Sequence, residues 1–251
     1  MKNILCVKWG DKYDSYVEVL KKQVDKHCSL DYKFYCLTDK PEREYDIPLP
    51  THWDENYIQE KNTFWAYRKL YMFNEDLFPQ LDGDEFLFLD LDILIHNSID
   101  HLFDLHPARP WIVRGWWNNI ENCRKNFGKI KSTPLNSSVI KWTRGQLKHV
   151  YDHIDKNKDV IFFSYSTIDN YLNHFWYNIW DEGKPKPDNS LFVGIPPGVV
   201  YSWYKGNVYP HDMDINILRK DHMICLFNNS SVGIDEHINE IDEVKELWSN
   251  I

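Results

Sequence analysis

Two carboxylates interrupt a long apolar stretch of this sequence. Residues 85–95 read Glu-Phe-Leu-Phe-Leu-Asp-Leu-Asp-Ile-Leu-Ile, so Asp90 and Asp92 stand within an otherwise apolar run. A run without alternation of apolar and polar residues predicts a strand that is buried on both faces. Because an ionised carboxylate is costly to bury without a partner, the pair predicts an exit from the core, a bound cation, or both. Residues i and i+2 of an extended chain point the same way, so both side chains could present oxygens to one divalent metal.

Two basic residues, Arg68 and Lys69, precede this strand in a segment with helical spacing. They could supply positive charge beside the carboxylates, although a solvated helix face would explain them equally well. The chain has no G-x-x-x-x-G-K-[ST] loop and no G-x-G-x-x-G turn after its first strand, so neither common glycine-rich loop holds phosphates here. If the ligand is a nucleotide, a metal and basic side chains must hold its phosphates instead.

Alternating strands and helices must position these residues. The opening strand, helix and strand are typical of a parallel α/β sheet, and no linker or repeat divides residues 1–251. The expected elements are strands at 3–8, 32–37, 86–95, 111–114, 137–142 and 223–227, helices at 13–24, 62–73, 143–154, 166–175 and 241–248, and loops at 40–60 and 181–198.

The composition excludes several classes of protein. With 251 residues, 43% of them hydrophobic, the chain can bury one full core. No apolar run approaches the ~20 residues of a membrane span, and the apolar start is too short for a signal peptide. Five scattered cysteines without a C-x-x-C pair argue against a disulfide framework or a zinc site, and they favour the reducing cytoplasm. The net charge of −9 disfavours nucleic acid as a partner, but a metal could still attract a small anion.

Four short segments follow one another in a distinctive order. They are Tyr-Arg-Lys-Leu at 67–70, Asp-Leu-Asp at 90–92, Leu-Asn-Ser-Ser-Val at 135–139 and Asp-Asn-Tyr-Leu-Asn at 169–173. This order resembles the GT-A glycosyltransferases, most closely the branch of glycogenin-like and lipopolysaccharide-galactosyltransferase-like enzymes. The resemblance implies one Rossmann-like α/β domain with a mainly parallel sheet, in which residues 1–105 bind the nucleotide and 106–251 bind the acceptor. It also implies a metal-dependent, retaining transfer of sugar from a nucleotide sugar, expected to be a UDP-sugar, to a glycan or a lipid-linked acceptor.

The resemblance also implies roles for individual positions. Asp90 would lie near the ribose and the metal, and Asp92 would ligate Mn²⁺ or Mg²⁺ at the donor diphosphate. Lys69, with Arg68 as the adjacent alternative, matches the basic residue that contacts the donor. The other residues expected around the donor are Lys8, Trp9, Gly10, Tyr13, Asp39 and Leu91. Those expected at the sugar and the reaction centre are Asn136, Asp169 and Asn170.

These residue types suit glycosyl transfer. Negative charge grows on the leaving diphosphate, and a divalent cation with a nearby lysine or arginine would stabilise it. The sugar passes through an oxocarbenium-like state, which the carboxylate of Asp169 or the amide of Asn170 could support.

The sequence departs from the family pattern at three positions. The glutamine that follows the family's aspartate is Asn170 here, and the glycine after Asn-Ser is Ser138. The late metal ligand of the family is a histidine at a strand end, where this chain has Asn228. His222 lies at the start of the same strand and is the second choice. Lys205, just before Gly206, is either a further contact to the diphosphate or a solvated turn lysine.

Two other functions are compatible with parts of the pattern. A haloacid-dehalogenase-type phosphatase also uses a D-x-D pair, with the first aspartate as nucleophile, but it expects the pair on the first strand and Thr or Val at the position of Leu94. A non-catalytic nucleotide- or sugar-binding module would explain the neutral Asn228. Acceptor binding is expected from loops 110–134 and 181–215, where a Trp116-Trp117 wall and the aromatic segment 201–204 could stack on sugar rings.

Overall fold

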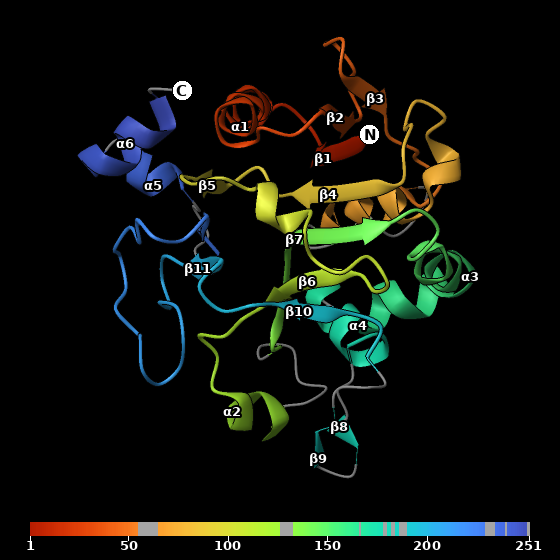
Figure 1. Ribbon diagram of the computed structural model, residues 1–251. Helices are drawn as coiled ribbons and strands as arrows, with labels where there is room; N and C mark the ends of the chain where they lie inside the picture. The colour runs from red at the N-terminus through yellow and green to blue at the C-terminus, as the bar shows by residue number, and fades with distance from the viewer. Residues whose placement is uncertain are drawn as a thin grey trace.

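A mainly parallel sheet forms the centre of the computed structural model, which describes residues 1–54, 65–125, 133–165, 167–177, 180–181, 184–185, 190–228, 234–238 and 240–249. Within these residues the sheet has seven strands in the order β10-β6-β7-β4-β1-β2-β3 (Figure 1). The strands are β1 Lys2–Lys8, β2 Tyr32–Thr38, β3 Asp46–Pro48, β4 Glu85–Leu89, β6 Trp111–Arg114, β7 Leu135–Thr143 and β10 Val193–Ile195. Only β7 pairs antiparallel with its neighbours, so the expectation of a mainly parallel sheet is confirmed.

Both faces of this sheet are buried. Successive side chains of β1 point to opposite faces of the sheet. Ile4 and Cys6 pack in a hydrophobic core on one face, and Leu5 packs in a second core on the other. Helix α1, Asp14–His27, covers the first face. The second face is covered by the 3₁₀ helix η2, Trp65–Phe73, together with α3, Lys148–Ser164, and α4, Ile168–Phe175.

Smaller elements complete the described structure. A second sheet has the order β11-β12-β5, and β8 pairs with β9. The bounds of these strands are β5 Ile93–Ile95, β8 Trp180–Asp181, β9 Lys184–Pro185, β11 Val200–Ser202 and β12 Ile224–Leu226. The remaining helices are η3 Glu75–Leu77, η4 Asp100–Leu102, α2 Ile120–Lys125, α5 Asp235–Ile238 and α6 Asp242–Ser249. None of the described helices has the length and apolar composition that crossing a membrane requires.

The single strand predicted at 86–95 is wrong. Strand β4 ends at Leu89 and β5 begins at Ile93 in a different sheet, so residues 90–92 form the link between the two sheets. Because the sequence is apolar on both sides of the carboxylates, its periodicity does not show where β4 ends and β5 begins. The carboxylates therefore leave the core where one sheet ends, which was one of the two predicted ways of accommodating them.

Other boundaries also differ from the prediction. The helix expected at 62–73 is a 3₁₀ helix from Trp65, and positions 62–64 and 166 lie outside the described residues. Strand β3 lies in the loop expected at 40–60. Strands β9 and β10 lie within the loop expected at 181–198, and β8 overlaps its first residue. The helix expected from residue 143 begins at Lys148 because β7 continues to Thr143, and it extends to Ser164. Strands of two or three residues are too short to show a period of two.

Candidate active site

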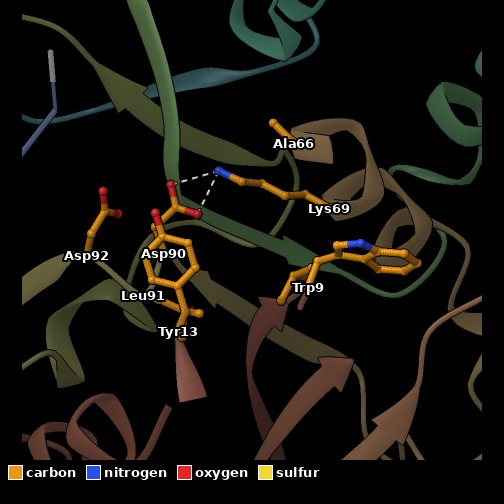
Figure 2. Close-up of a pocket in the computed structure, with 8 residues that line it drawn as sticks. Trp9, Tyr13, Ala66, Lys69, Asp90, Leu91 and Asp92 are labelled. Atoms are coloured by element: carbon orange, nitrogen blue, oxygen red, sulfur yellow. Dashed lines mark hydrogen bonds and ion pairs between the residues drawn. The ribbon is translucent and has the colours of Figure 1, made fainter. Parts of the chain in front are cut away.

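A cavity of about 130 Å³ opens where β1 and β4 end (Figure 2). Its walls come from the turn after β1, from η2 and from the link between β4 and β5. The lining residues are Val7, Trp9, Tyr13, Ala66, Lys69, Asp90, Leu91 and Asp92. Strands β1 and β4 run parallel, and ligands of open α/β sheets bind beyond the carboxyl ends of such strands. The cavity therefore collects both aspartates and one of the two predicted cations.

Asp90 is held from two directions. The Nζ atom of Lys69 lies 2.6 Å from Oδ1 and donates a 2.7 Å hydrogen bond to Oδ2 of Asp90, as Figure 2 shows. The backbone N–H of Asp90 donates a 2.9 Å hydrogen bond to the carbonyl oxygen of Ser138 on β7. Burial favours the neutral form of Lys69, but the attraction of Asp90 outweighs it and the pKa of Lys69 is raised. Lys69 is therefore a charged lysine inside the cavity and does not belong to a solvated helix face.

Asp92 has a different environment. Among the described residues no ion pair to its carboxylate is formed at salt-bridge distance, and its side chain points into the cavity (Figure 2). Burial, together with repulsion by Asp90, raises the pKa of Asp92 to about 6. Lys69 and Lys12 counteract this shift, but they do not cancel it. Among the described residues, Asp92 thus has two lysines in its surroundings but no cation at salt-bridge distance.

The residues predicted for the reaction centre lie beside Asp90. The backbone N–H of Ser137 donates a 3.0 Å hydrogen bond to Oδ1 of Asp169, which connects the start of α4 to the start of β7. Asn136 accepts a 2.9 Å hydrogen bond from the N–H of Ser138. Burial raises the pKa of Asp169, while Ser137 and Lys69 act to lower it. Two segments that are far apart in sequence therefore meet next to the Lys69–Asp90 pair.

Helix α4 begins with a capping interaction that includes Asn170. The hydroxyl of Thr167 accepts a 3.2 Å hydrogen bond from the backbone N–H of Asn170, so the first turn is fixed at the edge of the site. Because Asp169 precedes Asn170 in this turn, the same cap positions both residues.

Of the other residues expected around the donor, Trp9, Tyr13 and Leu91 line the cavity, and Lys8, Gly10 and Asp39 do not. Trp9 and Tyr13 face the cavity (Figure 2). Lys8 is only 1% exposed and its ammonium group pairs with Asp14. The N–H of Gly10 lies 3.0 and 3.2 Å from the two carboxylate oxygens of Asp39 and donates to them. Gly10 has a φ of 71°, a conformation that glycine adopts without strain.

Arg68 does not share the cavity with Lys69. Its guanidinium carbon lies 3.4 Å from the centre of the Trp9 ring, and its Nε lies 3.3 Å from Oδ1 of Asp54. The two adjacent basic residues therefore point to different partners, and only Lys69 contacts the carboxylate pair.

The end of β12 runs back toward the aspartates. Leu226 pairs with Ile93 in the antiparallel β12–β5 ladder, so the residues after Leu226 continue alongside the link that contains Asp92. The side-chain oxygen of Asn228 accepts a 2.6 Å hydrogen bond from Ser202. His222 precedes the strand end that pairs with Ile95 and forms a 2.9 Å contact with Asp221. Of the two candidates, Asn228 is on the side of Asp92.

Lys205 follows β11 and does not line the cavity. It is partly buried and, within the described ranges, forms no ion pair. Burial lowers its pKa, and Cys123 on α2 opposes this shift. The backbone turns at Gly206, whose φ is 78°.

The predicted aromatic walls are mostly core. Trp117, Tyr201 and Trp203 are at most 3% exposed and pack in the core, so the prediction that they stack on a sugar is wrong. Trp116 and Tyr204 remain partly exposed. The indole N–H of Trp116 donates a 2.8 Å hydrogen bond to the carbonyl oxygen of Ile195.

Lys12 is a charged neighbour of the site that the sequence prediction missed. It lies between two predicted residues, Gly10 and Tyr13, acts on Asp92 and is 3.9 Å from Asp235 on α5. A basic residue in the turn after the first strand was the available signal. No cluster of three or more His, Cys, Asp or Glu side chains that could hold a metal occurs in the described part of the chain.

Neither a protein-family model nor a curated protein sequence matches this chain. Its shape does match solved structures. An active-site mutant of LgtC aligns over 99% of this chain and 95% of LgtC, with a TM-score of 0.60 and 14% identity. The galactosyltransferase LgtC with donor and acceptor sugar analogues aligns over 99% and 96%, with a TM-score of 0.59 and 13% identity. A glycosyltransferase involved in the glycosylation of the major capsid of PBCV-1 aligns over 96% and 99%, with a TM-score of 0.55 and 16% identity.

The chain has the GT-A fold. At these identities the likeness establishes the arrangement of the chain, and it confirms the predicted α/β class and the resemblance to GT-A glycosyltransferases at the level of fold. The cavity at the ends of β1 and β4 is the part of this GT-A fold where Asp90, Asp92 and Lys69 come together.

Proposed function

We propose that this protein is a metal-dependent, retaining glycosyltransferase that uses a nucleotide sugar, expected to be a UDP-sugar. One observation carries the proposal: the charged pair of Lys69 and Asp90 shares a strand-end cavity with Asp92, whose carboxylate has no cation at salt-bridge distance among the described residues. Such a cavity offers both signs of charge to a diphosphate and its metal. The acceptor is expected to be a glycan or a lipid-linked sugar.

The residues present fit Mn²⁺ or Mg²⁺. These hard cations take oxygen ligands, and Mg²⁺ is commonly held by one or two carboxylates with the remaining positions left to water and substrate phosphate. Asp90 and Asp92 would supply the carboxylates and Asn228 an amide oxygen. Burial and repulsion by Asp90 raise the pKa of Asp92, and a cation bound at this carboxylate would offset both effects. A bound cation would stabilise the negative charge that develops on the departing diphosphate.

The protein's own groups would perform the remaining tasks. The nucleobase would lie against Trp9 and Tyr13, and Lys69 would place a fixed positive charge near the leaving group. Asp169, fixed by the N–H of Ser137, would support the oxocarbenium-like sugar together with Asn170.

Asn136 and Lys205 have lesser roles in this proposal. The amide of Asn136 would border the sugar at the start of β7. Lys205 would reach the diphosphate only if the turn at Gly206 moved, because Lys205 does not line the cavity.

The phosphatase alternative receives no support from the position of the motif. It expects the aspartate pair on the first strand, whereas β1 ends at Lys8 and the pair follows β4. Its nucleophile would be Asp90, both of whose oxygens are engaged by Lys69.

Release of nucleoside diphosphate tests the proposal. Purified protein with Mn²⁺ is incubated with UDP-, GDP- and ADP-sugars, with EDTA and the Asp92→Asn variant as controls. Metal-dependent release that the substitution abolishes supports the proposal, and proton NMR of the product anomer against the donor tests retention. Phosphate release from phosphomonoesters alone would indicate the phosphatase, and nucleotide binding without turnover would indicate a binding module.

A further inference from the structure

Two consecutive side chains of η2 point in different directions. Lys69 reaches Asp90 inside the cavity, whereas Arg68 lies against Trp9 and is only 4% exposed. Trp9 lines the cavity and Arg68 does not. Arg68 therefore acts on the cavity through the indole that it touches, and it has no surface of its own in the cavity.

The contact between Arg68 and Trp9 is close. A distance of 3.4 Å from the guanidinium carbon to the ring centre is that of a stacked guanidinium. Figure 2 shows Trp9 at the edge of the cavity, on the same side as the stem of Lys69. A side chain packed on the indole in this way limits the rotation of Trp9 away from the cavity.

Asp54 balances the charge of Arg68 without orienting it. Its Oδ1 lies 3.3 Å from Nε of Arg68, yet both atoms are buried and neither forms a hydrogen bond within the described residues. An ion pair with this geometry offsets charge but sets no direction, because direction comes from aligned hydrogen bonds. The stacked indole is then the contact that defines where the guanidinium lies.

Stability alone does not explain a buried pair of this kind. Burial lowers the pKa of Arg68 and raises the pKa of Asp54, although each partner counteracts the shift of the other. Both shifts favour the neutral forms, so burial costs more than the mutual attraction returns. Apolar side chains at both positions 54 and 68 would be as stabilising or more so, whereas an apolar side chain at position 68 alone would leave Asp54 buried without its partner. A role at the cavity explains why an arginine stands there.

We propose that Arg68 is a positioning residue that holds the indole of Trp9 as the wall against which the donor's nucleobase stacks. This proposal rests on the proposed function and changes the role of Arg68 from an alternative contact to the donor phosphates. Every nucleobase has a flat face that can stack on an aromatic ring. Stacking on Trp9 would therefore strengthen binding of the base and not of the diphosphate. Asp54 supports the arrangement by keeping Arg68 charged in a buried place.

The test separates base from diphosphate. Isothermal titration calorimetry with Mn²⁺ measures the Kd of inorganic pyrophosphate and of the tightest binder among UDP, GDP, ADP and CDP. Trp9→Ala and Arg68→Met are expected to weaken nucleotide binding by about tenfold or more, which is the scale of a base–aromatic stack, and to leave pyrophosphate binding unchanged. Trp9→Phe should retain most of the nucleotide affinity. Arg68→Lys, which keeps the charge and loses the planar group, should fall between wild type and Arg68→Met.

Each other outcome overturns the inference. An equal loss for nucleotide and pyrophosphate in Arg68→Met means that Arg68 contacts phosphate directly, and no loss for either ligand means that Trp9 needs no support. Arg144→Met is the matched control, because Arg144 stacks on the buried Phe86 ring away from the cavity and should change neither Kd. Should Arg68→Met fail to fold, Arg68→Lys and Trp9→Ala decide the result. If the wild-type protein binds no nucleotide, the proposed function is overturned as well. If it binds nucleotide, but the ratio of the nucleotide Kd to the pyrophosphate Kd is the same in Arg68→Met as in wild type, only this inference is overturned.

Discussion

Asp90 and Asp92 stand two positions apart, but the protein treats them differently. Asp90 is bonded by Lys69 through both oxygens, and its backbone is fixed to β7. Asp92 points into the same cavity without an ion pair among the described residues, and its pKa is raised to about 6. Among the described residues, Asp90 therefore has a cation at hydrogen-bond distance and Asp92 has none at salt-bridge distance. If the proposed metal binds here, Asp92 is the carboxylate that is not already paired with a lysine.

The largest expected effect is that of Asp92→Asn. Removing this carboxylate should lower sugar transfer by about 10³-fold, because the charge that holds the metal at the diphosphate is halved. The same change should leave the metal-free protein as stable as wild type or more stable, since it removes repulsion with Asp90. Diphosphate release and thermal unfolding with EDTA measure the two effects.

Asp90→Asn should behave differently in the stability measurement. It leaves the ammonium group of Lys69 without its carboxylate in a cavity, so we expect a loss of about 1–3 kcal/mol in the free energy of unfolding. Equal stabilities for the Asp90→Asn and Asp92→Asn variants would show that the two environments are energetically alike.

Lys69→Met is expected to be the next largest change. It removes a positive charge near the leaving group and should lower kcat by about 10²-fold. Lys69→Arg keeps the charge with a different shape and should recover part of that loss. The matched control is Lys148→Met, because Lys148 pairs with Asp76 at the surface and should alter kcat little. A kcat for Lys69→Met within a factor of two of wild type would remove Lys69 from the mechanism.

The sequence predicted the Asp90 side of this site better than the rest. Strand ends, the order of segments and the lysine at position 69 predict that Lys69, Asp90 and Asp169 lie in one region. In the structure Lys69 bonds Asp90, and the neighbouring β7 residues Ser137 and Ser138 bond Asp169 and Asp90. A carboxylate in an apolar run is visible without knowing the fold. The pattern could not show that the chain changes sheets at residues 90–92, because that depends on pairing with β12.

The orientation of neighbouring side chains was beyond the sequence. Adjacent residues of a helix point in different directions, so Arg68 and Lys69 of η2 face different partners, and the packing of η2 in the fold decides which of them enters the cavity. The sequence predicts Trp117 and Trp203 as stacking walls, and only the packed core shows that they are buried. Residues whose role depends on long-range packing have no local periodic signal.

The stability of the metal-free protein should depend on pH through Asp92. Its folded-state pKa of about 6 lies above the ordinary value of 3.8, so the folded protein binds this proton more tightly than the unfolded chain does. The contribution of Asp92 to the free energy of unfolding is therefore largest below about pH 4 and is lost as the pH rises through about 6. We expect a loss on the order of 1–2 kcal/mol after allowance for solvent at the open cavity.

Urea unfolding with EDTA between pH 4.5 and 7.5 measures this loss, using Asp92→Asn as the comparison protein. The variant should lack this part of the pH dependence. Mn²⁺ should reverse the slope in wild type, because a metal binds the ionised carboxylate. Identical pH profiles for the two proteins would show that neither burial nor Asp90 raises the pKa of Asp92.

The smallest effect is expected at Asn228, on the far side of Asp92. A neutral amide is a weaker ligand than a carboxylate, and the oxygen of Asn228 already accepts a hydrogen bond from Ser202. Asn228→Ala should therefore weaken Mn²⁺ binding only about two- to fivefold. Asn228→His places at this position the histidine of the pattern that the sequence resembles, and it should strengthen Mn²⁺ binding if this position ligates the metal. Titration of Mn²⁺ by calorimetry in the presence of UDP measures both. Ser202→Ala separates ligation from packing: it should leave Mn²⁺ affinity unchanged or slightly raised if Asn228 reaches the metal. If Asn228→Ala and Ser202→Ala lower thermal stability equally and leave Mn²⁺ affinity unchanged, Asn228 holds the end of β12 to β11 and the metal site consists of the two aspartates alone.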